Sequence, residues 1–156
     1  KIKMTELDSL DVVFIAFAFL FQIILMAHFS LRKWHFNLAM RFGPIVYALS
    51  ILFAAISIVL LAAGKSWSFW VGGFIYLAWA VFGFIVEYRY KINWRRLPIQ
   101  WSIVGPYVLL YLAANMFYWF PLALLYKSLW YVYAVLFAAN TYLNFTSHKV
   151  RAAQAA

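Results

Sequence analysis

The sequence predicts an all-α fold, a polytopic bundle of transmembrane helices, and two observations lead to this prediction. The first is composition: 68% of the 156 residues are hydrophobic and only 11% are charged, whereas a soluble domain carries about 25% charged residues. The second is that the apolar residues come in blocks of about 20, the length that a helix needs to cross about 30 Å of hydrocarbon. Residues 1–156 are therefore predicted to form a single transmembrane domain.

The first three predicted spans are apolar blocks bounded by polar residues or glycine. Asp8 or Ser9 is the expected N-cap of the first block, because a short polar side chain can accept a bond from the first free backbone N–H groups. Gly64 ends the second block. These spans are predicted at about 11–31, 43–63 and 69–88.

The apolar stretch that remains must fold back on itself. As one helix, residues 99–146 would be about 70 Å long, more than any bilayer accommodates. Pro121 removes a backbone donor and Lys127 adds polar character, so "FPLALLYKS" is predicted to be a turn. A fourth span at about 98–120 and a fifth at about 129–147 follow from it.

Positive charge alternates from loop to loop and predicts the orientation of the chain. Bases cluster after the first, third and fifth spans, whereas single lysines follow the second and fourth. By the positive-inside rule, the N-terminus lies outside and the C-terminus in the cytoplasm, in a prokaryotic plasma (inner) membrane. The net charge of +9 is assigned to this orientation and to anionic headgroups, so no nucleic-acid partner is predicted. The clusters are Arg32, Lys33 and Arg41; Arg89, Lys91, Arg95 and Arg96; Lys149 and Arg151; the single lysines are Lys65 and Lys127.

Each predicted span has one face that carries polar, small or aromatic residues. These residues recur every three or four positions, so they lie on one side of a helix. Because polar side chains are costly in hydrocarbon, we expect these faces to turn inward. In chain order they are Ala18 and Gln22; Tyr47, Ser50, Ala54 and Ser57; Gly72, Tyr76, Gly83 and Glu87, with Trp79 nearby; Tyr107, Tyr111 and Asn115; and Tyr133, Phe137, Asn140, Asn144 and His148.

Two interpretations of these faces remain open. In the first they serve packing, because small residues let helices approach and polar groups bond between helices. In the second they line an aromatic pocket for a flat or lipid-like ligand whose orientation is set by a few polar groups. The predicted ligand-binding residues are Tyr76, Trp79, Tyr107, Tyr111, Asn115 and Asn140.

Glu87 is the one acid well inside a predicted span, and it also has two interpretations. It lies about one turn from the cytoplasmic boundary, near the level of histidines on the first and last spans, and could form a proton relay or polar gate with them. Alternatively, it pairs with Arg89, Lys91 or a loop arginine at the headgroup level. The predicted gate residues are Glu87, His28, Asn144 and His148.

No metal, cofactor or catalytic site is predicted. The chain has no cysteine and three histidines, and a haem held by His28 and His148 would use two of those three near helix ends. A zinc site lacks third and fourth ligands. The sequence contains no nucleophile–base motif and no glycine-rich phosphate loop, so an intramembrane enzyme ranks last among the alternatives.

The architecture is similar to that of the tryptophan-rich sensory protein (translocator protein) family, which binds porphyrins and sterols. Five spans in about 150 residues, aromatic richness and an outside N-terminus carry this resemblance, and "FAANTYLN" is loosely similar to a run in that family's last span. The family's proline- and tryptophan-rich first loop is replaced here by "RKWHFNLAMR". The resemblance covers architecture only and transfers no functional residue.

The leading functional hypothesis is a non-enzymatic membrane protein that binds or moves a hydrophobic or amphiphilic small molecule, or a lipid, in its aromatic interior. The runner-up is a structural or assembly subunit, or the membrane anchor of a larger complex, with a membrane-protein partner or a second copy of itself. A third hypothesis is a proton-coupled transporter or channel that uses Glu87.

Overall fold

The computed structural model describes residues 7–92 and 100–154, with side chains as far as residue 147. All regular structure in these ranges is helical, which confirms the predicted all-α class. The elements are α1 (Ser9–Trp34), α2 (Phe36–Ala62), α3 (Trp67–Phe84), the π-helical turn η1 (Ile85–Arg89), α4 (Trp101–Leu125) and α5 (Lys127–Gln154).

Within the described ranges, four helical segments are long and apolar enough to cross a membrane, as expected for a membrane protein. They are α1, α2, α3 together with η1, and α4. The fifth helix, α5, is 28 residues long but carries Asn140, Asn144 and the basic C-terminal residues along its length. The predicted start of the fourth span, residue 98, falls outside the described residues.

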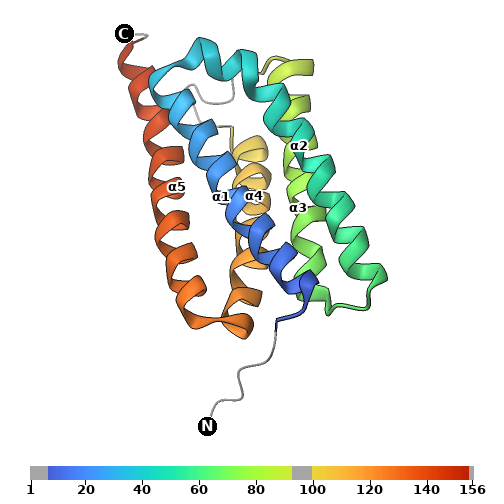
Figure 1. Ribbon diagram of the computed structural model, residues 1–156. Coiled ribbons are helices and arrows are strands. Elements are labelled where there is room, and N and C mark those ends of the chain that lie inside the picture. The colour runs from blue at the N-terminus through green and yellow to red at the C-terminus, as the bar shows by residue number, and fades with distance from the viewer. Residues whose placement is uncertain (1–6, 93–99, 155–156) are drawn as a thin grey trace.

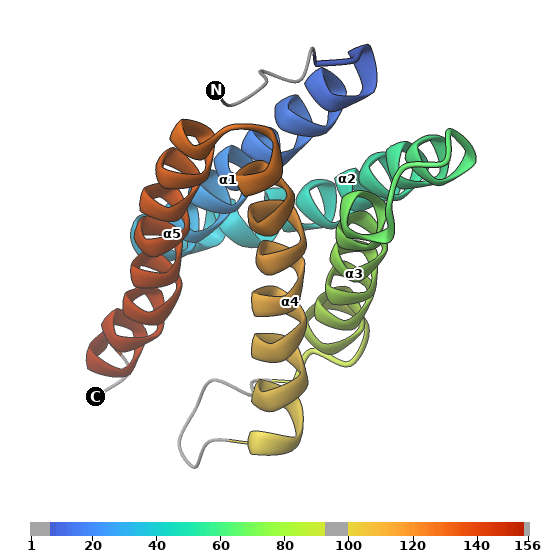
Figure 2. The same ribbon diagram turned by 90° about the horizontal axis from the view of Figure 1, so that it is seen from below.

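The helices run alternately up and down and close into a ring (Figure 1). Each helix packs against its neighbours in the chain, and α5 returns to pack along α1, which also contacts α4. The turns α2–α3 and α4–α5 therefore share one end of the bundle with the start of α1, and the α1–α2 corner and η1 share the other (Figure 1). Seen from below, α4 and α5 diverge from their common turn (Figure 2).

The first helix begins at the predicted N-cap. The Asp8 side chain accepts a bond from the Asp11 backbone N–H at 2.8 Å, and the Asp11 side chain accepts from the Asp8 N–H at 3.3 Å. This reciprocal capping box satisfies donors that the first helical turn leaves free.

The predicted loop between the first two spans is wrong in extent. The helix α1 continues to Trp34, and α2 starts at Phe36, so His35 alone interrupts the helices. Charge at Arg32 and Lys33 suggested a loop, but both continue α1, and Arg32 turns into the protein interior.

The predicted turn at "FPLALLYKS" contains the observed reversal but is too long. Pro121 lies within α4, which continues to Leu125, and the chain reverses at Tyr126 in an extended conformation. Proline deletes one N–H donor but does not force the chain to reverse, and membrane helices tolerate it. The hairpin is held instead by Trp119, whose ring stacks on Trp130 at 4.7 Å and whose Nε1 donates to the Trp130 carbonyl at 3.0 Å.

Most residues of the predicted inward faces are buried, as expected, whereas Phe137 is only partly buried. Gln22, Ser50, Tyr76, Tyr107 and Asn140 each expose 1% or less of their surface. The helices α3 and α2 approach each other closely at Gly73, where a Cβ would lie 2.5 Å from the Phe53 carbonyl oxygen. Small residues at such a crossing allow backbones to meet without a side chain between them.

Candidate functional site

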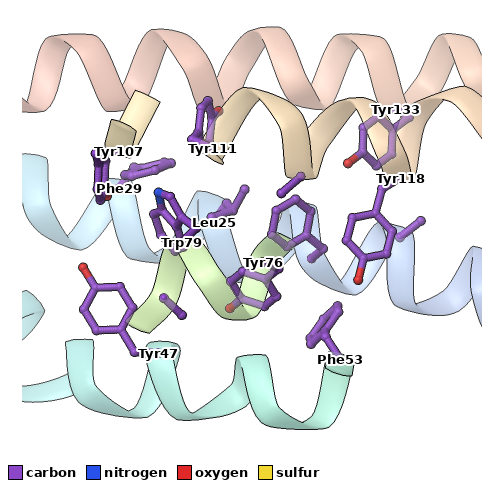
Figure 3. Close-up of a cluster of buried hydrophobic side chains, with 14 of the residues drawn as sticks. Leu25, Phe29, Tyr47, Phe53, Tyr76, Trp79, Tyr107, Tyr111, Tyr118 and Tyr133 are labelled. Atoms are coloured by element: carbon purple, nitrogen blue, oxygen red, sulfur yellow. The ribbon is translucent and has the colours of Figure 1, made fainter. Parts of the chain in front are cut away.

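Aromatic rings from α1, α2, α3, α4 and α5 fill the middle of the bundle (Figure 3). Trp79 of α3 lies at their centre, with ring centroids 5.7 Å from Tyr47, 5.9 Å from Tyr76 and 5.2 Å from Tyr107. Tyr111 of α4 extends the cluster, with its ring 5.8 Å from that of Phe29. These separations are typical of favourable aromatic pairs. Four of the six predicted ligand-binding residues are thus members of one buried cluster: Tyr76, Trp79, Tyr107 and Tyr111.

A buried ion pair lies at one end of this aromatic cluster. Arg32 of α1 donates from Nη1 to Glu87 Oε1 at 2.9 Å, and its Nη2 also bonds Glu87 Oε2. The Tyr47 hydroxyl of α2 donates to the same Oε2 at 2.8 Å. The two charged side chains expose only 2% and 7% of their surface. The pair therefore ties α1, α2 and the end of α3 together inside the protein.

Glu87 reaches this position from an irregular turn. It lies in η1, where the α-helical pattern of α3 changes to the wider π-helical one. Such turns shift the register of the side chains that follow them and are frequent at functional sites. On α1, His28 and Arg32 are four residues apart, so their side chains lie on one face of the helix.

Three buried nitrogen atoms beside the ion pair have no hydrogen-bond partner among the described residues: His28 Nε2, Arg32 Nε and Trp79 Nε1. We call these three residues the donor cluster. Its members surround Tyr47, whose ring lies 5.8 Å from that of His28 and whose hydroxyl lies 3.4 Å from Arg32 Nη2. Leaving a buried polar group unpaired costs about 1–3 kcal/mol, so three at one place need an explanation.

A second polar region lies further along α1, around Gln22, and we call it the amide network. Gln22 Nε2 donates to Asn115 Oδ1 at 2.7 Å, and Asn140 Nδ2 donates to Gln22 Oε1 at 2.5 Å. The Asn115 amide also donates to the Tyr111 carbonyl at 2.8 Å. Asn115 and Asn140, both predicted to bind ligand, therefore bond to α1 and join α1, α4 and α5.

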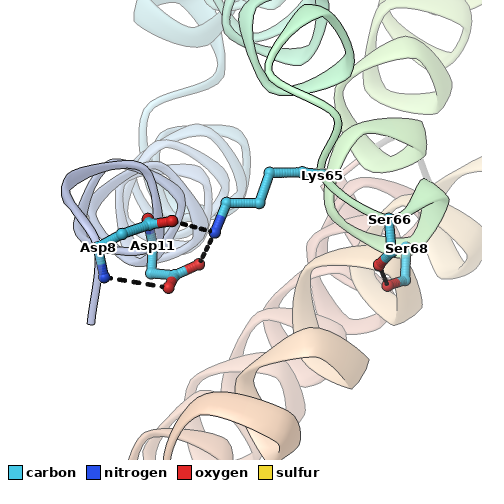
Figure 4. A network of polar contacts seen from close by, with 5 residues as sticks. All are labelled: Asp8, Asp11, Lys65, Ser66 and Ser68. Atoms are coloured by element: carbon cyan, nitrogen blue, oxygen red, sulfur yellow. Dashed lines mark hydrogen bonds and ion pairs between the residues drawn. The ribbon is translucent and has the colours of Figure 1, made fainter. Parts of the chain in front are cut away.

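A third polar group lies at the opposite end of the bundle, near solvent (Figure 4). Lys65 Nζ, in the α2–α3 turn, lies 2.7 Å from Asp8 Oδ2 and 2.6 Å from Asp11 Oδ1. The bond from Lys65 lowers the pKa of the Asp8 carboxyl below its usual 3.8. Partial burial opposes charge on Lys65, but its bonds to Asp11 and Asp8 outweigh that effect and hold its pKa above the usual 10.5.

The structure brings together only part of the predicted gate. Glu87 and His28 both contact Tyr47. Glu87 pairs with Arg32, one of the arginines that the sequence placed in a loop, which agrees with the alternative of pairing with a loop arginine rather than with Arg89 or Lys91. The pair is buried, however, and does not lie at the exposed headgroup level. Asn144 lies on α5, where its carbonyl accepts from Ser147 at 2.7 Å. The side chain of His148 falls outside the described residues.

Sequence reasoning did not single out two of the paired residues. Arg32 was assigned to a loop because of its charge. The one sequence signal for an inward position was that Arg32 lies four residues after His28 and therefore on the same helix face. Lys65 was treated as an isolated outer charge, although two acids begin the chain's first helix. Across the ranges that the structure describes, no group of three or more histidine, cysteine or acidic residues is placed to hold a metal ion.

Comparison with known proteins does not assign the chain to a family. No family model matches the chain, and neither a curated protein nor a solved structure matches it significantly.

Proposed function

We propose that this protein binds, or carries within the membrane, a hydrophobic or amphiphilic small molecule in the aromatic interior around Trp79. The observation that supports this proposal is the coincidence of two features. Rings from α2, α3 and α4 offer apolar contact area, and the donor cluster beside them holds polar atoms without partners in the described part of the chain. Ligand sites typically combine such an apolar wall with a few polar groups that orient the ligand.

The proposal is tested by what the protein carries when it is purified in native lipid. We expect mass spectrometry of the extracted protein to detect a stoichiometric small molecule, and Tyr111→Phe to lower its occupancy without unfolding the protein. Absence of any bound molecule, combined with a Tyr111→Phe variant that is only more stable, would contradict the proposal. A stoichiometric protein partner without a small molecule would instead support the assembly role.

We also propose that α5 is a fifth span, so that the N-terminus lies outside and the C-terminus in the cytoplasm of a prokaryotic plasma membrane. The alternation of basic loops supports this topology. Because the chain has no cysteine, single cysteines can be introduced for labelling. Positions 65 and 127 should label from outside, and positions 93 and 152 only after permeabilisation. The opposite pattern, or labelling of positions 127 and 152 from the same side, would contradict the topology.

A second candidate function is proton-coupled transport through Glu87. Its support is that Glu87 is a buried acid that contacts both an arginine and a tyrosine hydroxyl within a π-helical turn. If Glu87 carries a proton, Glu87→Gln should abolish proton-coupled flux in liposomes while the protein stays folded. Unchanged flux would exclude this candidate.

A further inference from the structure

We infer that the ligand presents an uncharged carbonyl oxygen on a flat ring, as a quinone does, to the N–H groups of Trp79 and Arg32. This inference rests on the proposed function and adds the chemical class of the ligand. It follows from three properties of the donor cluster: the direction of its hydrogen bonds, its charge balance and the shape of its walls.

The direction of the hydrogen bonds requires an acceptor. An indole N–H and a guanidinium N–H can only donate, whereas an imidazole nitrogen can donate or accept. Trp79 Nε1 and Arg32 Nε both have no partner among the described residues. In Figure 3 the Trp79 nitrogen faces the side of the cluster where Phe29 and Tyr107 lie. A ligand group that only donates would leave these atoms unpaired, whereas a carbonyl oxygen has two lone pairs and can accept from both.

The charge balance favours a neutral acceptor. The positive charge of Arg32 already faces the carboxylate of Glu87 through two bonds. A carboxylate or phosphate placed beside them would bring a second negative charge into a buried site that holds one positive charge. Burial of a charge without a partner is strongly unfavourable. An uncharged carbonyl adds two acceptor lone pairs and no charge.

The walls of the donor cluster are aromatic rings. The Trp79 ring contacts those of Tyr47 and Tyr107, which come from α2 and α4. All three residues expose 4% of their surface or less. A ligand ring that enters between them replaces one aromatic contact of Trp79 with another, so the apolar contact is kept while the N–H groups gain a partner. A ketone or quinone fused to an aromatic ring combines both features.

Three probes of nearly equal shape separate these properties: menadione, a neutral naphthoquinone; 2-methylnaphthalene, which lacks the carbonyls; and 2-naphthoate, which carries a negative charge. Binding is measured by equilibrium dialysis of protein in lipid nanodiscs, with binding to empty nanodiscs subtracted. We expect saturable binding of menadione with an affinity at least several times higher than that of either other probe.

Trp79→Phe keeps an aromatic ring and removes the indole donor, so it should weaken menadione binding about two- to tenfold, as loss of one neutral hydrogen bond predicts. Binding of 2-methylnaphthalene should not change. Trp101→Phe is the matched control, because Trp101 is 71% exposed. Circular dichroism confirms that both variants are folded. If the Trp79 variant is unfolded, the ranking of the three probes on the wild-type protein decides whether the site prefers a neutral carbonyl ligand.

The outcomes distinguish the class of ligand from the existence of a site. Equal saturable binding of menadione and 2-methylnaphthalene would overturn the carbonyl inference and leave the proposed function standing. Preferential binding of 2-naphthoate would overturn the argument from charge in the same way. Absence of saturable binding by all three probes would overturn this inference, and absence of a co-purified molecule as well would overturn the proposed function.

Discussion

The amide network and the donor cluster are both buried, both polar and both built on α1, yet their polar atoms are paired to different degrees. In the amide network, Gln22 bonds to Asn115 and Asn140 from two other helices, and one oxygen, Asn140 Oδ1, has no partner in the described structure. In the donor cluster, the Arg32–Glu87 pair is complete, but three neighbouring nitrogen atoms have no partner in the described structure. The proposed binding site therefore rests on the larger number of unpaired atoms in the donor cluster, and not on burial and polarity alone.

Removal of one charge from the buried ion pair should have the largest effect on stability. Arg32→Met leaves Glu87 buried without its positive partner, which we expect to lower the free energy of unfolding by about 3–5 kcal/mol. Denaturant titration in detergent measures this change. The double variant Arg32→Met with Glu87→Leu should recover most of the loss, because no uncompensated charge remains. A double variant as unstable as the single one would contradict the assigned pairing.

Disruption of the amide network should have a smaller effect. Asn115→Leu removes the acceptor of the Gln22 bond and the donor to the Tyr111 carbonyl. We expect a loss of about 1–2 kcal/mol in the same titration, since interhelical hydrogen bonds in membranes are individually modest. Met116→Leu on the neighbouring position, which is 39% exposed, is the control and should change little. A more stable Asn115→Leu protein would contradict the packing role of the network.

The polar group near solvent should matter less than either interior region. Lys65 bonds Asp8 and Asp11, but Asp8 is about half exposed, and exposed ion pairs are weakened by water and salt. Lys65→Met should therefore lower the melting temperature less than Asn115→Leu does. The difference in melting temperature between Lys65→Met and the wild-type protein should shrink in 1 M salt. A larger loss than that of Asn115→Leu would show that this end, rather than the interior, holds the bundle together.

The smallest expected effect is a dependence of stability on pH from Asp8. Because the folded state holds the pKa of Asp8 below 3.8, the charged carboxylate favours folding. This contribution is fully present above about pH 4 and disappears as the pH falls through the lowered pKa. Melting curves of the wild-type protein and Asp8→Asn between pH 3 and pH 6 should therefore converge at the acidic end. A difference that grows as the pH falls would contradict the assigned pairing.

The inward faces of the helices were predictable because they depend on local spacing. Tyr107, Tyr111 and Asn115 follow the helical period, and all three are buried. The turns were less predictable, because Pro121 weakens a helix without ending it and the reversal at Tyr126 depends on packing between Trp119 and Trp130.

The partners across the bundle were not predictable from local patterns. Arg32 and Glu87 are 55 residues apart in the chain, and Lys65 is 57 residues from Asp8. A charge in a mainly apolar sequence is assigned to a loop unless its partner is known. The candidate site could therefore be predicted as an aromatic face, whereas its charged end became visible only in the folded structure.

The most direct test of the proposed binding site is an experimental structure of the protein crystallised from lipid in the presence of menadione. We predict density for the ring beside Trp79, with a carbonyl oxygen within about 3.2 Å of the indole nitrogen and the Arg32–Glu87 pair intact. Density for menadione only on the lipid-facing surface, with the rings of Tyr47, Trp79 and Tyr107 still in contact, would contradict a ligand site in the interior.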